Sequence, residues 1–275
     1  MKDTSIGFIG CGNMARSLIG GLLKDGHPPA RISAADPDPG QRERARQFGI
    51  EVLDDNDAVI RDADAVVLAV KPQVLPDMVR AAAPVLAERR PLLISVAAGI
   101  RLATLHRCLS ADLPVVRVMP NTPSLIQAGA AALVAGPSVT AEQRDLAEGI
   151  MRAVGLALWL EDEAQMDAVT AVSGSGPAYF FLVMEVMIKA GERLGLPAET
   201  AHLLTLETAL GAAKMALESE SGPADLRRQV TSPGGTTEQA LKVLLEEGDI
   251  EQLFARALGA AKRRSEELAA ELGER

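Results

Sequence analysis

The sequence has few of the residues that build disulfide frameworks and metal sites. Its only cysteines are Cys11 and Cys108, so we expect free thiols, a reducing compartment and, by default, the cytoplasm. Of the three histidines, His27 precedes a Pro-Pro turn, while His106 and His202 fall in predicted helices. Each is therefore expected to be structural or exposed rather than catalytic. Because no His, Cys and carboxylate cluster has metal-ligand spacing, no metal site is predicted.

Positive charge and long apolar runs are also scarce. The net charge is −9, and no basic stripe that could neutralise nucleic-acid phosphates is present. The most apolar long segment, residues 179–196, is interrupted by charged side chains, so no run of about 18 apolar residues is expected to span a membrane. The first predicted strand begins at about Ser5, which leaves no room for a signal peptide. We expect neither nucleic acid nor a membrane as a partner.

Aromatic residues make up only 3% of the chain, whereas alanine is abundant. Ala-rich helices can approach one another closely. This composition is typical of tight helix packing or of a helical subunit interface.

The first part of the chain alternates short apolar runs with helical patterns. Runs that are continuously apolar, such as residues 65–70, indicate strands covered on both faces. Helices are expected at 13–25, 40–48, 73–88, 101–110 and 140–153, and strands at 5–9, 31–35, 51–53, 65–70, 92–96, 115–119, 131–134 and 157–160. The pattern predicts a doubly wound α/β domain over residues 1–161.

From residue 162 to 275 the pattern is helical, with no convincing strand. Helices are expected at 163–170, 175–195, 198–220, 223–230, 235–247 and 249–272, and prolines and glycines mark their boundaries. The charged stretch 262–275 is interpreted as a solvated helix end. The second domain is therefore predicted to be all-helical.

A glycine-rich turn follows the first predicted strand. Gly10-x-Gly12-x-x-Ala15 joins that strand to an amphipathic helix, as in a dinucleotide-binding βαβ unit. There Gly10 permits the tight turn, Gly12 admits the pyrophosphate, and Ala15 lets the helix pack on the strand. Backbone N–H groups at the helix start then face the phosphates. The turn predicts a dinucleotide cofactor.

Further candidate positions follow the other strands. Asp36 ends the second strand, where a carboxylate can accept a hydrogen bond from the ribose 2′-hydroxyl and would repel a 2′-phosphate. The same Asp36 fits an ordinary Asp-Pro turn, so the choice between NADH and NADPH stays open. Lys71, in the segment 69–72, is either a cofactor contact or a surface lysine.

Three loops concentrate small polar and helix-breaking residues, at 119–123, 173–177 and 231–237. The last two precede helices, where free backbone N–H groups can hold a small carboxylate without arginine. Helix capping by Ser or Thr is the alternative, but the run 231–237 exceeds what a cap requires. We interpret it as a substrate site.

The lack of a catalytic histidine also constrains the reaction. Alcohol oxidation generally needs a base for the hydroxyl proton. Reduction of a protonated imine does not, because the C=N bond is already electrophilic and the product amine keeps its proton. Hydroxyls and backbone amides would suffice for that reaction.

These motifs together resemble the Δ1-pyrroline-5-carboxylate reductases, which catalyse the last step of proline biosynthesis. The resemblance runs essentially end to end. Its motifs are GFIGCGNMA at the amino end, AVKP at 69–72, VAAGI at 96–100, MPNTP at 119–123, AVTAVSGSGPAY at 168–179 and VTSPGGTTEQAL at 230–241.

The resemblance implies a Rossmann domain followed by a helical domain that interlocks with a second copy, the dimers often assembling into decamers. It implies NADPH- or NADH-dependent reduction of 1-pyrroline-5-carboxylate to L-proline. By similarity, the cofactor would be lined by Gly10, Cys11, Gly12, Asn13, Met14, Ala15, Asp36, Asn56, Ala69, Val70, Lys71, Pro72 and Ala98. The substrate would be held by Ser232, Pro233, Gly234, Gly235, Thr236 and Thr237, and the Thr237 hydroxyl would act catalytically near the ring nitrogen.

Two positions remain open. Glu220 matches an acidic residue near the substrate amine or is one more charge of an exposed run. Many family members have a small hydroxyl residue in place of Asp36, which leaves the cofactor preference undecided. The alternative functions are a related imine or keto-acid reductase of the same layout and, on no specific feature, a dinucleotide-sensing protein. Feedback by proline, flux direction and the choice of dimer or decamer are not predicted.

Overall fold

The fold is that of a computed structural model, which describes residues 2–109 and 111–273. Ser110, the last residue of the expected helix 101–110, lies outside the described residues, as do the last two residues of the charged segment 262–275. The chain divides into two compact units. The first is Met1–Ser175 with Ala260–Arg275, and the second is Gly176–Gly259.

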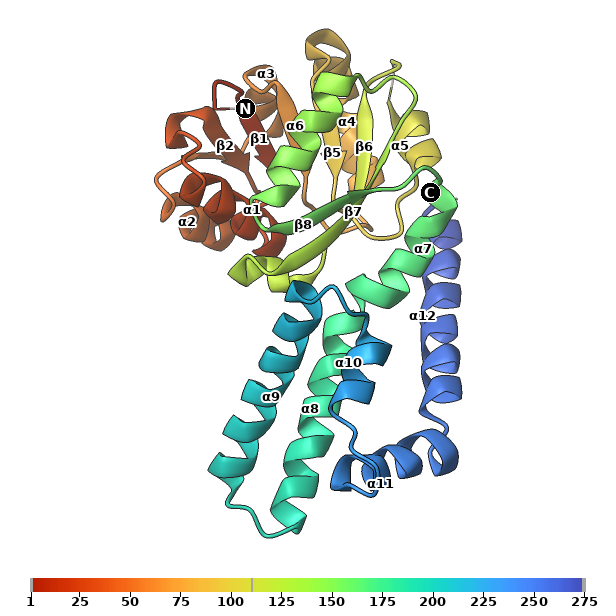
Figure 1. The fold of residues 1–275 in the computed structure, drawn as a ribbon. Coiled ribbons are helices and arrows are strands. Elements are labelled where there is room, and N and C mark those ends of the chain that lie inside the picture. Colours follow the sequence, from red (N-terminus) through yellow and green to blue (C-terminus); the bar gives the residue numbers. More distant parts are fainter. Residues whose placement is uncertain (1, 110, 274–275) are drawn as a thin grey trace. The chain divides into compact units, whose positions relative to one another are not determined.

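The first unit is built on one eight-stranded sheet in the order β3-β2-β1-β4-β5-β6-β7-β8 (Figure 1). Every expected strand is present, with ends that differ by no more than two residues. The strands are β1 (Ile6–Ile9), β2 (Ile32–Ala35), β3 (Glu51–Leu53), β4 (Ala65–Leu68), β5 (Leu92–Ser95), β6 (Val115–Met119), β7 (Gly129–Ala135) and β8 (Gly155–Trp159).

Strands β1 to β6 are parallel, but β7 runs antiparallel to β6, and β8 is parallel to β7. The connection between β6 and β7 contains only the short helix η2 (Thr122–Ile126). A parallel crossover needs about a dozen residues or more, usually with a full helix. The short connection therefore reverses the strand direction, and the 119–123 loop lies at this reversal.

Helices cover both faces of the sheet, as expected for a doubly wound domain. The helices α1 (Asn13–Lys24), α2 (Pro39–Arg46) and α6 (Ala141–Arg152) pack on one face. The helices α3 (Asn56–Arg61), α4 (Leu75–Arg89) and α5 (Leu102–Cys108) pack on the other, together with Leu272.

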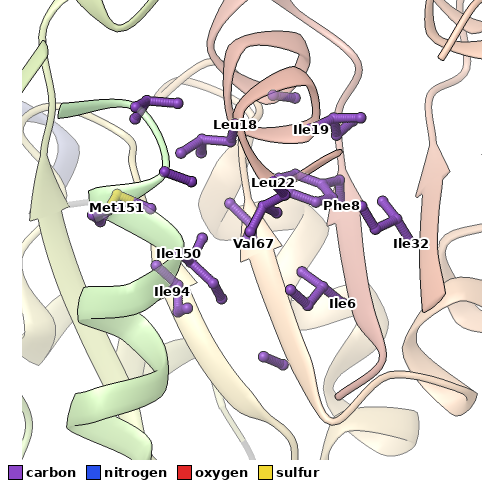
Figure 2. Close-up of a cluster of buried hydrophobic side chains, with 14 of the residues drawn as sticks. Ile6, Phe8, Leu18, Ile19, Leu22, Ile32, Val67, Ile94, Ile150 and Met151 are labelled. Carbon is purple, nitrogen blue, oxygen red and sulfur yellow. The ribbon is translucent and has the colours of Figure 1, made fainter. Parts of the chain in front are cut away.

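Strand side chains alternate between the two faces. In β4, Val67 belongs to the core under α1 and α6, while Val66 and Leu68 belong to the core under α3 and α4. Figure 2 shows the first core, where Leu18 and Leu22 of α1 lie beside Phe8 of β1. Burial on both faces is the physical reason for the continuously apolar strands.

Helix α3 was not expected from the sequence. It has only six residues, too few for a clear period, and Asp55 caps it by accepting a hydrogen bond from the Asp57 N–H at 2.9 Å. The Asp55 cap was the available signal. The helix also places Asn56 directly after the carboxyl end of β3.

The second unit is all-helical, as expected. Helices α8 and α9 pack side by side, since a Cβ added to Gly191 would lie 3.3 Å from the Ala201 Cβ. The helices are α8 (Gly176–Arg193), α9 (Ala198–Glu218), α10 (Pro223–Gln229), α11 (Thr236–Lys242), the π-helix η5 (Val243–Glu247) and α12 (Ile250–Gly273), which from Ala260 onward belongs to the first unit.

Three short helices precede the second unit in the chain and belong to the first unit. They are η3 (Glu163–Gln165), α7 (Met166–Val169) and the π-helix η4 (Thr170–Gly174). The compact units therefore divide the chain at other places than residue 161. The expected division by role, cofactor binding in 1–161 and substrate binding with dimerisation in 162–275, stays a prediction.

One helical stretch in the described chain, Glu163–Arg193, is long and apolar enough to cross a membrane by length and composition alone. It begins upstream of the segment 179–196, so the expectation that no stretch reaches this length does not hold by this measure. Only 11% of its most apolar window is buried, and Phe180 and Phe181 are more than 60% exposed. A single such helix is weak evidence for a span, because length and composition alone do not distinguish a spanning helix from other apolar helices.

Candidate functional site

The glycine turn after β1 has a conformation that depends on Gly10. Its φ of 97° lies in the left-handed region, and a Cβ there would approach the Ala69 carbonyl oxygen to 2.7 Å. The Gly10 N–H donates to the Ala35 carbonyl at 2.7 Å. Gly10 thus joins the ends of β1, β2 and β4 at one point, where only glycine fits without strain.

The start of α1 behind Gly12 is open. A Cβ on Gly12 would meet no other atom within 4 Å, and no side chain accepts a hydrogen bond from the helix start. The first turn of α1 contains no acidic residue. Unpaired N–H groups and the positive end of the helix dipole favour an anion here. Asn13, Met14 and Ala15 form this first turn, so the geometry fits a dinucleotide pyrophosphate.

Both carboxylate oxygens of Asp36 accept hydrogen bonds from the backbone. Its Oδ2 accepts a hydrogen bond from the Cys11 N–H at 2.8 Å, and its Oδ1 accepts one from the Asp38 N–H at 2.9 Å. The second bond is that of the turn former considered in the sequence. The first ties the carboxylate to the glycine turn, a contact between residues 25 positions apart. Ribose binding by Asp36 stays a prediction.

The Cys11 side chain is buried beneath the same turn. Burial, followed by the neighbouring Asp36 carboxylate, raises the pKa of the Cys11 thiol to about 11. The thiol is therefore protonated at neutral pH and unreactive. Cys11 can contribute to cofactor binding only through its backbone.

The remaining cofactor candidates lie at the same edge of the sheet. Ile9 is in register with Ala35 and Leu68, and Leu68 with Ser95. The residues that follow these strands are therefore neighbours. They include Ala69, Val70, Lys71 and Pro72 after β4, and Ala98 after β5; Asn56 follows β3. Lys71 and Ala98 are exposed, and the carboxyl edge of such a sheet is where ligands bind.

Sequence reasoning missed two arginines at this edge. The Arg16 guanidinium donates to the Cys11 carbonyl at 2.7 Å, and the Arg42 guanidinium to the Asp36 carbonyl at 2.8 Å. Arg16 thus contacts the glycine turn, and Arg42 contacts the residue that follows β2. Their signal in the sequence was weak, because an arginine on a helix surface is ordinary.

Two of the three loops singled out in the sequence are joined in the first unit. The Asn121 amide donates to the Ser173 carbonyl at 3.1 Å, and its Oδ1 accepts from the Ala130 N–H at 2.9 Å. Gly174 lies against Met119, since an added Cβ would be 2.4 Å from the Met119 Cε. The loop 119–123 is thus fixed to the π-helix η4.

The third loop, 231–237, belongs to the second unit. Gly234 has a φ of 73°, the Gly235 N–H donates to the Ser232 carbonyl at 3.0 Å, and the Gly234 N–H donates to Glu238 at 2.8 Å. No side chain caps α11. Simple capping by Ser232, Thr236 or Thr237 therefore does not account for this turn, and its role as a substrate site stays a prediction. Pro233 is exposed within it.

Glu220 lies in an exposed bend after α9. Within the described part of the chain its carboxylate has no hydrogen-bond or ion-pair partner. Among the described residues no hydrogen bond or ion pair joins Glu220 to the turn 231–237, and both interpretations of Glu220 stay open.

Two of the three histidines, His27 and His106, belong to the first unit, and His202 belongs to the second. His27 is buried and His202 is exposed on α9, while the buried Nε2 of His106 faces Gly136. Burial lowers the pKa of His27 below its ordinary 6.5. Within the described part of the first unit, neither His27 nor His106 lies beside the glycine turn, because His27 contacts Thr4 before β1 and His106 faces Gly136.

Residues 163–268 match the family model for pyrroline-5-carboxylate reductase dimerisation, and residues 5–99 match that for F420-dependent NADP oxidoreductases. The chain is 55% identical to the pyrroline-5-carboxylate reductase of Pseudomonas aeruginosa over the whole of both chains. The chain belongs to the pyrroline-5-carboxylate reductase family.

Solved structures agree with this assignment. The reductase of Coxiella burnetii has a TM-score of 0.92 and 46% identity, covering 96% of this chain and 98% of its own. A Plasmodium falciparum pyrroline carboxylate reductase with NADP bound has a TM-score of 0.86 and 28% identity, covering 98% of this chain and 99% of its own. The Rossmann fold with a helical second part and the use of NAD(P)H are those of this family.

Proposed function

We propose that this chain reduces 1-pyrroline-5-carboxylate to L-proline with NADPH or NADH, as the last step of proline biosynthesis. The observation that carries the proposal is the full-length match to the pyrroline-5-carboxylate reductases, which includes both the glycine turn and the turn 231–237. The open start of α1 behind Gly12 supports the same conclusion, because it suits a pyrophosphate.

The cofactor is held by the carboxyl edge of the sheet in the first unit. The N–H groups of the first turn of α1 bind the pyrophosphate, and the segments 69–72 and 96–98 lie along the nicotinamide half. The bound cofactor supplies a hydride to the C=N carbon of the substrate. The ring nitrogen bears the proton that makes the bond electrophilic and keeps it in the product, so no base is required.

The substrate is held by the turn 232–237. Backbone N–H groups of this turn bind the substrate carboxylate, and the Thr237 hydroxyl hydrogen-bonds at the ring nitrogen and orients the C=N bond. Since this role is one of positioning and electrostatics, Thr237→Ala is expected to lower kcat about 10- to 100-fold without abolishing turnover. Thr208→Ala, at an exposed threonine of α9 outside this turn, is the control. Undiminished turnover of Thr237→Ala would remove Thr237 from the mechanism.

The activity is tested by following the oxidation of NADH and of NADPH with racemic 1-pyrroline-5-carboxylate. A parallel panel contains 1-pyrroline-2-carboxylate and six-membered cyclic imines. Turnover that prefers 1-pyrroline-5-carboxylate supports the proposal. Preference for another imine or a keto acid assigns the chain to a related reductase. Dinucleotide binding without turnover of any of these compounds assigns it to a sensor.

We further propose that the chain acts as a homodimer, and that the dimers assemble into decamers in the cytoplasm. The dimerisation match covers 163–268, and α8 in this range exposes Phe180, Phe181 and Leu182. In the first unit, Leu156 and Leu158 of β8 line an open apolar groove of about 420 Å³. Apolar surfaces of this kind are typical of subunit contacts.

The oligomer is tested by sedimentation of the wild type and of Phe180→Asp/Phe181→Asp. The wild type is expected to sediment as a dimer or larger, and the variant is expected to dissociate, because two charges would be buried at the contact. Glu185→Ala, an exposed residue of the same helix, is the control. A monomeric wild type would contradict this proposal.

A further inference from the structure

The carboxylate of Asp36 is held in place by the backbone. Each of its oxygens accepts a backbone hydrogen bond, from Cys11 at 2.8 Å and from Asp38 at 2.9 Å. Asp36 therefore acts as a strut between the glycine turn and the turn after β2. The Cys11 and Asp38 N–H groups also partly offset the negative charge of the Asp36 carboxylate.

Arg42 supplies positive charge at the same place. One of its nitrogens, Nη1, donates to the Asp36 carbonyl at 2.8 Å and to the Pro37 carbonyl at 2.9 Å. Its Nη2 and Nε have no partner among the described residues, and no carboxylate pairs with it there. These two hydrogen bonds hold the Arg42 guanidinium against the backbone of Asp36 and Pro37. Its Nη2 and Nε groups can still donate to a ligand.

Arg16 lies on the other side of the strut. Its Nη1 donates to the Cys11 carbonyl at 2.7 Å and to the Gln41 Oε1 at 2.6 Å, and its Nη2 donates to Asn13 at 2.5 Å. All three acceptors are neutral, so its charge is not paired within the described part of the chain. Both arginines act on the Cys11 thiol as opposing charges to Asp36.

The acidic groups at this edge are Asp36 and Asp38 after β2, and Asp54 and Asp55 after the neighbouring strand β3. The Asp38 Oδ1 caps α2, where it accepts from the Gly40 N–H at 2.6 Å and the Gln41 N–H at 3.3 Å. Asp36, Asp38 and Asp55 accept hydrogen bonds from backbone donors. The two guanidinium groups are bound only to neutral oxygens, so their positive charge is still available to a further anion.

We propose that Arg42, supported by Arg16, receives the 2′-phosphate of NADP(H) beside Asp36, so that this chain binds NADP(H) and NAD(H) alike. An arginine near the end of the second strand accommodates that phosphate in dinucleotide folds, and a guanidinium binds phosphate through two parallel donors. The inference rests on the proposed function, which places the dinucleotide on the glycine turn.

The test measures binding by calorimetry, without turnover. The probes are adenosine 2′,5′-bisphosphate and adenosine 5′-monophosphate, which differ only in the 2′-phosphate, together with NADP⁺ and NAD⁺. The wild type is expected to bind the two members of each pair within about tenfold of each other. Arg42→Ala is expected to weaken the 2′-phosphorylated probes about tenfold or more and to leave the others within about threefold.

Two further variants separate a specific contact from a general charge effect. Arg46→Ala removes the same charge from the same helix, but Arg46 pairs with Glu43, so no selective loss is expected. Arg42→Lys keeps the charge and is expected to recover part of the binding. If Arg42→Ala does not fold, Arg42→Lys is compared with the wild type instead, and it is expected to bind the 2′-phosphorylated probes more weakly than the wild type does.

The outcomes distinguish the two proposals. Wild-type binding of adenosine 5′-monophosphate and NAD⁺ but not of the 2′-phosphorylated probes would overturn the inference and leave the proposed function intact. An equal loss in Arg42→Ala and Arg46→Ala would also overturn it. A wild type that binds none of the four probes would overturn the placement of the dinucleotide and the inference together.

Discussion

Two alanine substitutions in the glycine turn are expected to separate folding from cofactor binding. Gly10 has a φ of 97°, and its added Cβ would lie 2.7 Å from the Ala69 carbonyl oxygen, a backbone atom. A left-handed conformation costs an L-residue about 1–2 kcal/mol. A backbone shift that relieves such a contact costs about 1–3 kcal/mol more. Gly10→Ala is therefore expected to lower the free energy of unfolding by about 2–5 kcal/mol.

Gly12→Ala is expected to behave differently. Gly12 has a φ of −66°, and its added Cβ meets no other atom within 4 Å. Restriction of the unfolded chain stabilises such a substitution by about 0.4–1 kcal/mol, and alanine at the N-cap costs about as much. The free energy of unfolding should stay within about 1 kcal/mol of the wild type. The new methyl group occupies the approach of the pyrophosphate, so the dinucleotide should bind about tenfold or more weakly.

The assay combines urea unfolding with NAD⁺ and NADP⁺ titration of the folded proteins. Gly99→Ala serves as a reference, because Gly99 also has a positive φ, of 77°, but an added Cβ would meet no atom closer than 3.4 Å. Wild-type stability of Gly10→Ala would refute the steric reasoning. Wild-type dinucleotide affinity of Gly12→Ala would refute the placement of the pyrophosphate.

Two predictions concern buried polar groups in the first unit. Burial holds the pKa of His27 below 6.5, so the stability of the neutral ring is present above about pH 6.5 and is lost as the pH falls through the lowered value. Urea unfolding at several pH values should show that the free energy of unfolding falls less steeply with acid in His27→Leu than in the wild type. An equally steep fall in both proteins would contradict this prediction. Arg117 is 3% exposed and pairs with Glu163 at 2.7 Å, so Glu163→Ala should cost about 3 kcal/mol by leaving a buried charge. The double variant Glu163→Ala/Arg117→Met should regain at least half of the free energy of unfolding that Glu163→Ala loses. An equal loss in the single and the double variant would contradict the pairing.

Much of the fold could be predicted from the sequence, because strand and helix periods are local properties. The continuous apolar run 65–70 indicated a strand buried on both faces, and Val66 and Val67 do belong to opposite cores. The positions of the strands, and hence the carboxyl edge that carries the cofactor candidates, follow from such runs. Helix α3 was not predicted, because its six residues are too few to show a helical period.

Strand direction and long-range contacts could not be predicted in the same way. The reversal of β7 depends on how short its connection is, and the junction of Asn121 with Ser173 joins residues 52 positions apart. The return of the chain end from Ala260 to the first unit depends on partners such as Asp167, which accepts a hydrogen bond from the Ser265 hydroxyl at 2.6 Å. No local pattern encodes these pairings.

The amino-acid sequence already indicates a dinucleotide turn, a scarcity of histidine and a second glycine-rich turn, because these features depend on residue type and spacing. How the Asp36 side chain is held depends on the tertiary structure. Its carboxylate takes the Cys11 N–H from a turn 25 positions away, while Arg16 and Arg42 reach the same edge from different helices. A hydrogen bond between distant segments exists only once the sheet has brought their ends together, and this bond fixes where the Asp36 carboxylate lies beside the glycine turn.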